Sequence, residues 1–196
     1  MKKLSEAEIP TDYGKFKVMA FGDHVDEYSP HLALISEYGD LEESPVLVRI
    51  HSECITGDTF GSHRCECGEQ LTASLKRIGE DGGILIYLRQ EGRGIGLINK
   101  LKAYNLQDEG LNTVEANVHL GFEPDERHYD VAVQILEILG VKEIVLLTNN
   151  PDKVEAIRDS SVKLVDREPL IVPVRASNKN YMKTKESYFG HLLKHQ

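Results

Sequence analysis

The sequence predicts an α/β protein whose mixed, largely parallel sheet has flanking helices and a β-rich N-terminal part. From about residue 54 onward, short apolar runs alternate with segments of helical period, whereas the preceding residues show only strand-like runs. The chain has 196 residues, a length that suits one domain and buries about two thirds of its unfolded surface. We therefore expect a single domain over residues 1–196.

Strand patterns dominate the N-terminal third. Residues 14–19 alternate apolar and polar side chains, and residues 31–35 and 45–50 are short apolar runs. Runs of this length are typical of strands and too short for most helices. We expect these strands to extend the main sheet or to form a side sheet.

The middle of the chain changes to a strand, turn and helix rhythm. Residues 71–78 carry leucine and isoleucine at helical spacing, and the two glycines at 82–83 precede a strand-like run over residues 84–88. Apolar residues within 98–102 predict a further helix. The order of these segments favours parallel strands joined by helices.

The last third continues the same rhythm. Residues 129–139 have helical period and are followed by Gly140, the residue type expected just after a helix. Residues 144–147 predict a buried strand, and Pro151 suits the first turn of another helix. Residues 178–196 are polar, and we expect them to be partly mobile.

Three of the apolar runs end in polar turns that carry reactive side chains. In parallel sheets, ligand sites gather beyond the carboxyl ends of the strands. We therefore expect these turns to converge on one pocket. They are residues 51–54 after the run 46–50, residues 89–93 after the run 84–88, and residues 148–151 after the run 144–147.

Charge and hydropathy restrict the partners. The chain has 23 Lys and Arg against 32 Asp and Glu, a formal net charge of −9, so broad adhesion to nucleic acid or to an anionic membrane is not expected. The N-terminus has no apolar signal region, and the apolar runs are too short to span a bilayer. We expect a cytoplasmic protein in which a local cluster of cations meets any polyanionic ligand.

The cysteines indicate a metal site. Cys54, Cys65 and Cys67 are the only three in the chain, an odd number that does not suit a disulfide framework. Three thiolates can fill three positions of a tetrahedral zinc and leave the fourth for water, as in catalytic sites. The alternatives are a structural zinc completed by His51 or His63, or inert core thiols.

A glycine-rich loop is the second motif. Residues 89–96 read Arg-Gln-Glu-Gly-Arg-Gly-Ile-Gly between a strand and a helix, so glycine backbone, free amides and Arg89 and Arg93 could bind phosphates. The alternative is a flexible surface turn. Lys153 could add an anion contact, although many helical lysines are merely exposed.

A charged segment and a tyrosine complete the candidates. Residues 125–128, Asp-Glu-Arg-His, combine groups for proton transfer and phosphate contact, although charged loops are often only solvated. Tyr104 is spaced as a core residue, and its hydroxyl needs a partner if it is buried. We include Tyr104 among the catalytic candidates.

Together these segments resemble the GTP cyclohydrolase II family along nearly the whole chain. The match is carried by six motifs in the family's order, and no residue that the family uses for chemistry departs from its pattern. The motifs are residues 49–54 with 56–58 (RIHSEC, TGD), 64–70 (RCECGEQ), 89–97 (RQEGRGIGL), 113–117 (TVEAN), 120–122 with 125–127 (LGF, DER), and 147–151 (LTNNP).

The resemblance implies roles for individual residues. Cys54, Cys65 and Cys67 correspond to the family's zinc ligands, Asp125 to its proton acceptor and Arg127 to its nucleophile. Because a guanidinium has a pKa above about 12, a charged clamp on the α-phosphate is the competing role for Arg127. The residues implied to contact GTP are Arg49, Ile50, His51, Ser52, Glu53, Gln70, Glu91, Gly92, Arg93, Thr113, Thr148 and Lys153.

The resemblance also implies an activity: hydrolysis of GTP that releases formate and pyrophosphate and leaves a diaminopyrimidinone ribosyl phosphate, the first step of riboflavin biosynthesis. Zinc lowers the pKa of its bound water to about 7, and magnesium would neutralise the triphosphate. Family members are typically homodimers. Some carry a fused dihydroxybutanone-phosphate synthase half, for which this chain lacks the length.

Two other functions compete. A zinc deaminase acting on a base would need His-x-Glu and Pro-Cys-x-x-Cys signatures, which this sequence lacks. A structural-zinc module that senses a nucleotide would need a fourth side chain on the metal, whereas a water in that position favours catalysis.

Overall fold

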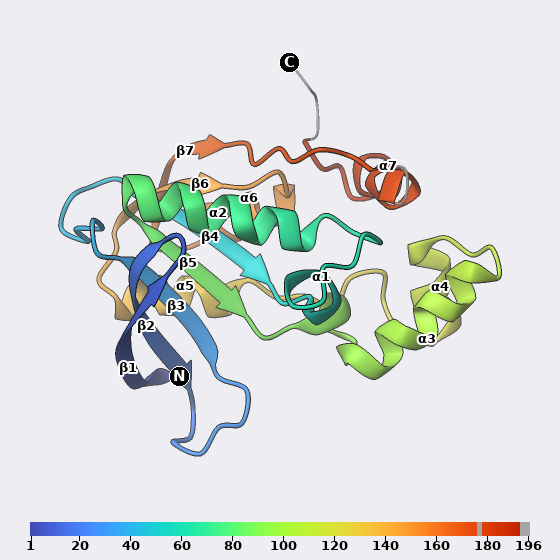
Figure 1. Ribbon diagram of the computed structural model, residues 1–196, viewed down its shortest axis with the longest axis horizontal. Helices are drawn as coiled ribbons and strands as arrows, with labels where there is room; N and C mark the ends of the chain where they lie inside the picture. Colours follow the sequence, from blue (N-terminus) through green and yellow to red (C-terminus); the bar gives the residue numbers. More distant parts are fainter. Residues whose placement is uncertain (176–177, 193–196) are drawn as a thin grey trace.

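A computed structural model describes residues 1–175 and 178–192 (Figure 1). Within them, seven strands form one mixed sheet in the order β1-β2-β3-β5-β4-β6-β7. The strands are β1 (Lys2–Thr11), β2 (Gly14–Gly22), β3 (His31–Ser36), β4 (Val46–Ser52), β5 (Ile84–Leu88), β6 (Glu143–Leu147) and β7 (Lys163–Glu168). The predicted α/β class is confirmed.

The sheet has an antiparallel part and a parallel part. Strands β1, β2 and β3 form an antiparallel meander, and β3 joins the rest by pairing antiparallel to β5. Strands β5, β4, β6 and β7 are mutually parallel. The β-rich N-terminal third therefore extends the main sheet, which is one of the two arrangements expected from the sequence.

Helices connect and cover the strands. The helices of the described residues are α1 (Ile55–Asp58), α2 (Cys67–Asp81), α3 (Gly96–Asp108), α4 (Thr113–His119), α5 (Asp130–Ile138), α6 (Pro151–Arg158) and α7 (Lys179–Ser187), with a short 3-10 turn, η1 (Glu91–Gly94). Figure 1 shows α2 on one side of the sheet and α5 on the other, while α3, α4 and α7 lie beyond the ends of β4 and β5.

The alternation of side chains along β5 builds two cores. Ile84 and Ile86 are fully buried in the larger cluster, which includes Ile135 of α5. Leu85, between them, points to the opposite face and packs with Ile78 of α2. Burial of each such side chain contributes about 1.5 to 3 kcal/mol. This two-sided burial explains why the run 84–88 is apolar throughout.

Helix ends follow the sequence signals. Gly140 follows α5 with a φ of 75°, a left-handed conformation that glycine adopts without steric strain. Asn150 caps α6 by accepting a hydrogen bond from the Asp152 amide at 2.9 Å, and Pro151 is its first residue. Among the described residues, no helix is long and apolar enough to cross a membrane.

Candidate active site

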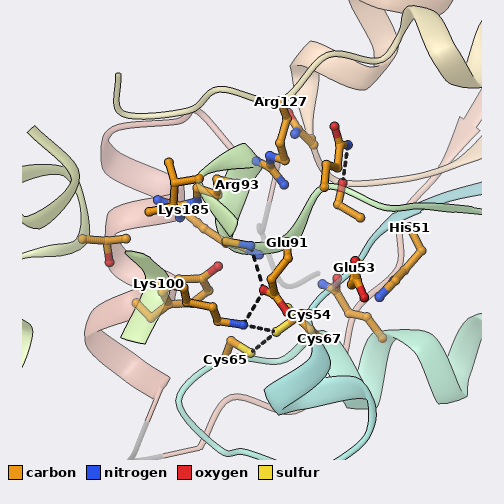
Figure 2. Close-up of a pocket in the computed structure, with 18 of the residues that line it drawn as sticks. His51, Glu53, Cys54, Cys65, Cys67, Glu91, Arg93, Lys100, Arg127 and Lys185 are labelled. Atoms are coloured by element: carbon orange, nitrogen blue, oxygen red, sulfur yellow. Dashed lines mark hydrogen bonds and ion pairs between the residues drawn. The ribbon is translucent and has the colours of Figure 1, made fainter. Parts of the chain in front are cut away.

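The three polar turns converge on one pocket beyond the carboxyl ends of β4, β5 and β6, as predicted (Figure 2). It is lined by every residue of the candidate set except Ile50 and Asp125. From the candidate set, the lining includes Arg49, His51, Ser52, Glu53, Cys54, Cys65, Cys67, Gln70, Glu91, Gly92, Arg93, Tyr104, Thr113, Arg127, Thr148 and Lys153. The structure therefore brings together residues that are far apart in the chain.

The three cysteines meet where α1 approaches α2. Their sulfur atoms all lie within 4.8 Å of one another, and the Cys54 and Cys65 sulfurs are 3.6 Å apart without a disulfide. The approach requires glycines, because a Cβ on Gly68 would lie 2.3 Å from the Gly57 carbonyl oxygen. Gly68 is therefore needed to bring the sulfurs together, and Gly57 leaves little room for a side chain, because a Cβ there would lie 3.1 Å from the Cβ of Cys67.

The donor set fits a zinc ion. Three buried or half-buried sulfurs in one group provide the soft ligands that zinc prefers. Among the described residues, neither histidine considered as a fourth ligand belongs to this group. The Nε2 atom of His51 instead lies 3.1 Å from Asp58 Oδ1, and His63 is exposed. This arrangement favours a metal with three protein ligands.

Asp58 holds the end of β4 in place. Its buried carboxylate accepts hydrogen bonds from the Cys54 amide at 3.0 Å and from the Tyr87 hydroxyl at 2.8 Å, in addition to the contact with His51. Burial lowers the pKa of His51, so this imidazole is held neutral despite its carboxylate neighbour. Asp58 thus orients a cysteine and a histidine of the pocket together.

Alternation along β4 decides which of its residues reach the pocket. Arg49 and His51 point to the α2 side, whereas the side chain of Ile50 is fully buried in the opposite core. Only the main chain of Ile50 is near the site, because its carbonyl oxygen accepts a hydrogen bond from Lys153 Nζ at 2.9 Å. A contact between Ile50 and a ligand would therefore have to involve its backbone.

Arg49 and Gln70 form a network at the start of α2. Arg49 donates to the Leu147 carbonyl oxygen at 2.9 Å and to Gln70 Oε1 at 3.1 Å. The Gln70 amide nitrogen donates to Glu66 Oε1 at 3.2 Å. Burial lowers the pKa of Arg49 to about 10, which still leaves it charged at neutral pH. The network fixes the orientation of the Gln70 amide.

The glycine-rich loop forms η1 and adopts an unusual backbone conformation. Gly92 has a φ of 65° and Arg93 a φ of 62°, so Arg93 is the one described residue other than glycine in the left-handed region. Such strain persists where the surroundings hold it, often at functional sites. The Arg93 side chain is buried and faces the pocket.

Asp125 and Arg127 form a two-point ion pair. Arg127 Nε donates to Asp125 Oδ1 at 2.8 Å, and its Nη2 pairs with Oδ2. Burial by itself would lower the pKa of Arg127, but Tyr129 and Asp125 outweigh it and hold that pKa above its usual value. Arg127 lines the pocket, and Asp125 supports it from behind.

Tyr104, Thr113 and Thr148 reach the pocket from three different segments. Tyr104 comes from α3, Thr113 begins α4, and Thr148 directly follows β6. Burial raises the pKa of the Tyr104 phenol, which keeps it protonated at neutral pH. Its hydroxyl can therefore act as a hydrogen-bond donor in the pocket.

Comparison with known proteins decides the family. A sequence model of the family described as GTP cyclohydrolase II matches residues 2–169. This chain belongs to the GTP cyclohydrolase II family. The resemblance inferred from the six motifs is therefore confirmed.

Named relatives agree with this assignment. A GTP cyclohydrolase-2 of Haemophilus influenzae (strain PittEE) is 48% identical over 195 residues, which cover 98% of this chain and 89% of that protein. A riboflavin biosynthesis protein RibBA of Bacillus subtilis (strain 168) is 53% identical over 186 residues, 94% of this chain. One from Chlorobium phaeovibrioides is 50% identical over 98% of this chain. The chain spans about half the length of these RibBA relatives, 46% and 47% respectively.

Sequence reasoning missed Lys100 in this GTP cyclohydrolase II family member. Lys100 is buried on α3, and its ammonium lies 2.7 Å from Glu91 Oε1 and 3.1 Å from the Cys54 sulfur (Figure 2). Burial by itself would lower the pKa of Lys100, but Cys54 and Glu91 outweigh it and raise that pKa. Lys100 therefore places a fixed positive charge beside the sulfur cluster. The sequence feature that could have identified Lys100 is its position, one helical turn after the glycine-rich loop.

The C-terminal segment was also missed. Tyr181, Lys185 and His191 line the pocket, although they lie beyond the matched residues 2–169. Lys185 is buried and pairs with Glu66, which is 1% exposed. The polar composition of residues 178–196 predicted a partly mobile segment. Within residues 178–192, three side chains of that segment line the pocket. Residues 193–196 lie outside the part of the chain that the structure describes.

Proposed function

We propose that this chain is a zinc-dependent GTP cyclohydrolase II that hydrolyses GTP to formate, pyrophosphate and a diaminopyrimidinone ribosyl phosphate, the first step of riboflavin biosynthesis. The observation that carries the proposal is a three-cysteine group in the wall of a pocket that is otherwise rich in cations. Family membership and the names of the relatives support it.

Cys54, Cys65 and Cys67 would hold the zinc. When bound, the metal supplies the Lewis acidity that activates water for hydrolysis near neutral pH. Lys100 offsets the negative charge of three thiolates, and Glu91 keeps its ammonium directed at Cys54. These residues would act on the guanine end of the substrate, where the ring is opened.

The cations of the pocket would bind the triphosphate. Arg93 and Arg127 both line it and are both buried or nearly so, in a chain whose formal net charge is −9. Burial and the neighbouring cations, Arg49 first, hold the pKa of Lys153 well below its usual value, so this lysine would gain its charge as the polyanion binds. Cations in a water-poor cleft attract a polyanion far more strongly than the same charges on the surface. Arg127, held by Asp125, is the residue that we assign to the α-phosphate, where pyrophosphate leaves.

The resemblance to the family carries three further parts of the proposal. Magnesium would bind with the triphosphate and help pyrophosphate to leave. The protein would be a homodimer, which sedimentation at equilibrium would test directly. It would act in the cytoplasm, where its nucleotide substrate is available.

Incubation of the zinc-loaded protein with GTP tests the activity. We expect a new pyrimidine chromophore, one formate and one pyrophosphate for each GTP consumed, and no product from ATP. Formate is measured enzymatically and pyrophosphate by coupled assay. Tight GTP binding without any formate would instead favour the alternative of a zinc module that senses a nucleotide.

Base recognition should depend on Gln70. We expect Gln70→Ala to lower kcat/KM for GTP by about 10- to 100-fold, because loss of a buried hydrogen-bonding group costs about 1 to 3 kcal/mol. The same change also releases Arg49 and Glu66 from the amide that they share. Steady-state kinetics with GTP measures the effect, and Gln134→Ala, an exposed amide on α5, is the control. An unchanged kcat/KM in Gln70→Ala would exclude the contact.

A further inference from the structure

The guanidinium of Arg93 lies near two aromatic rings. Its Cζ atom is 4.4 Å from the ring centroid of Phe189 and 5.4 Å from that of Tyr181. Both rings belong to the C-terminal segment, which follows the family match at residues 2–169. A guanidinium stacks on aromatic faces through its plane, which leaves its N–H edges available for a ligand.

The segment that carries these rings is tied to the pocket. Lys185 of α7 pairs with buried Glu66, between two of the cysteines. The Leu192 amide donates to the Asn149 carbonyl oxygen at 2.9 Å, in the turn after β6. Contacts on both sides of Phe189 therefore hold the ring against Arg93.

Arg93 itself forms no ion pair within the part of the chain that the structure describes. The carboxylate of Asp125 is near enough to interact with its charge, but that carboxylate pairs directly with Arg127. Its Nη1 atom is buried and has no hydrogen-bond acceptor among the described residues. A buried, unsatisfied N–H of a charged group is costly, and an anion in the pocket would satisfy it.

We propose that Tyr181 and Phe189 form an aromatic clamp that positions Arg93 to bind a phosphate group of the nucleoside triphosphate. This inference rests on the proposed function and adds the C-terminal segment to the substrate site. The rings would act through Arg93, so they are positioning residues. They would hold the plane of the Arg93 guanidinium, and the backbone of Arg93 is in the left-handed region.

Binding measurements on leucine variants test the clamp. We expect Phe189→Leu to weaken binding of inorganic tripolyphosphate and of the α,β-methylene analogue of GTP by about tenfold, while binding of guanosine stays unchanged. Tyr181→Leu, whose ring is farther from Arg93, should show the same pattern with a smaller change. Phe189→Tyr keeps the ring face and should restore binding. Isothermal titration calorimetry gives all of these dissociation constants.

The control removes an exposed ring elsewhere. Tyr38→Leu changes a side chain that is 69% exposed and follows β3, at the opposite end of the sheet from the pocket. It should leave all three ligands unaffected. Thermal unfolding of each variant shows whether the fold is kept, and Tyr181→Leu decides the question if Phe189→Leu does not fold.

The outcomes separate this inference from the proposed function. If the wild-type protein turns over GTP and both leucine variants bind tripolyphosphate normally, the clamp is wrong and the function stands. An equal loss for guanosine and tripolyphosphate would also overturn the clamp, because it would indicate general damage to the pocket. If tripolyphosphate binding depends on Phe189 but GTP yields no formate, the clamp stands and the function falls.

Discussion

Cys65→Ser is expected to lose bound zinc and the ring-opening activity together. The Cys65 side chain is 3% exposed and its sulfur is 3.6 Å from that of Cys54, so a neutral hydroxyl there would replace one of three thiolates. A serine hydroxyl is a poor zinc ligand at neutral pH, and the metal contributes several kcal/mol to such hydrolyses. We expect formate release to fall on the order of a thousandfold.

Metal analysis and a formate assay on the same preparation measure this effect. The fold should survive, because the large core around Ile84, Ile86 and Ile135 does not include the cysteines. Circular dichroism should therefore match that of the wild-type protein. Thr72→Ala, an exposed change on α2, is the control for expression and handling. Full zinc occupancy with undiminished formate release in Cys65→Ser would refute the ligand assignment.

Much of the fold was predictable because it depends on local patterns. The continuous apolar run at residues 84–88 marks a strand buried on both faces, and Gly140 and Pro151 mark helix ends for stereochemical reasons. The convergence of the three turns was also predictable, since parallel strands place their carboxyl ends at one edge of a sheet. The motifs then supplied most of the residues that line the pocket.

The remaining features depend on contacts that no local pattern encodes. Lys100 differs from other helical lysines only because α3 turns it toward Cys54 and Glu91. Lys185 lies in a polar helix whose buried partner, Glu66, is 119 residues away in the sequence. Ile50 belongs to a motif of the family, yet period-two alternation along β4 sends its side chain into the core.

Arg127→Ala is expected to lower kcat/KM by about a thousandfold, because Arg127 is a fixed cation in the pocket and removal of a preorganised charge costs that much in comparable sites. Arg127→Lys should recover part of the loss, since it retains the charge but not the two-point contact with Asp125. Steady-state kinetics measures both variants. Arg158→Ala, an exposed arginine at the end of α6, is the control.

The same residue separates two mechanisms. A nucleophilic Arg127 must first lose a proton. The kcat/KM of the enzyme would therefore rise with pH, because the neutral form of Arg127 becomes more abundant. The environment instead raises the pKa of Arg127, because Tyr129 and Asp125 outweigh the effect of burial. The guanidinium therefore stays charged throughout the working range, and a charged clamp gives no alkaline rise in kcat/KM.

Rapid quench with α-labelled GTP and intact-protein mass measurement provides the deciding test. We expect no phosphoramidate on Arg127 during a time course that resolves pyrophosphate release, because a charged guanidinium has no free electron pair for attack on phosphorus. Detection of such an adduct, formed and consumed at the rate of turnover, would establish the nucleophile and exclude the clamp. Undiminished turnover by Arg127→Ala would exclude both roles. The ion pair between Asp125 and Arg127 would then have no part in the reaction.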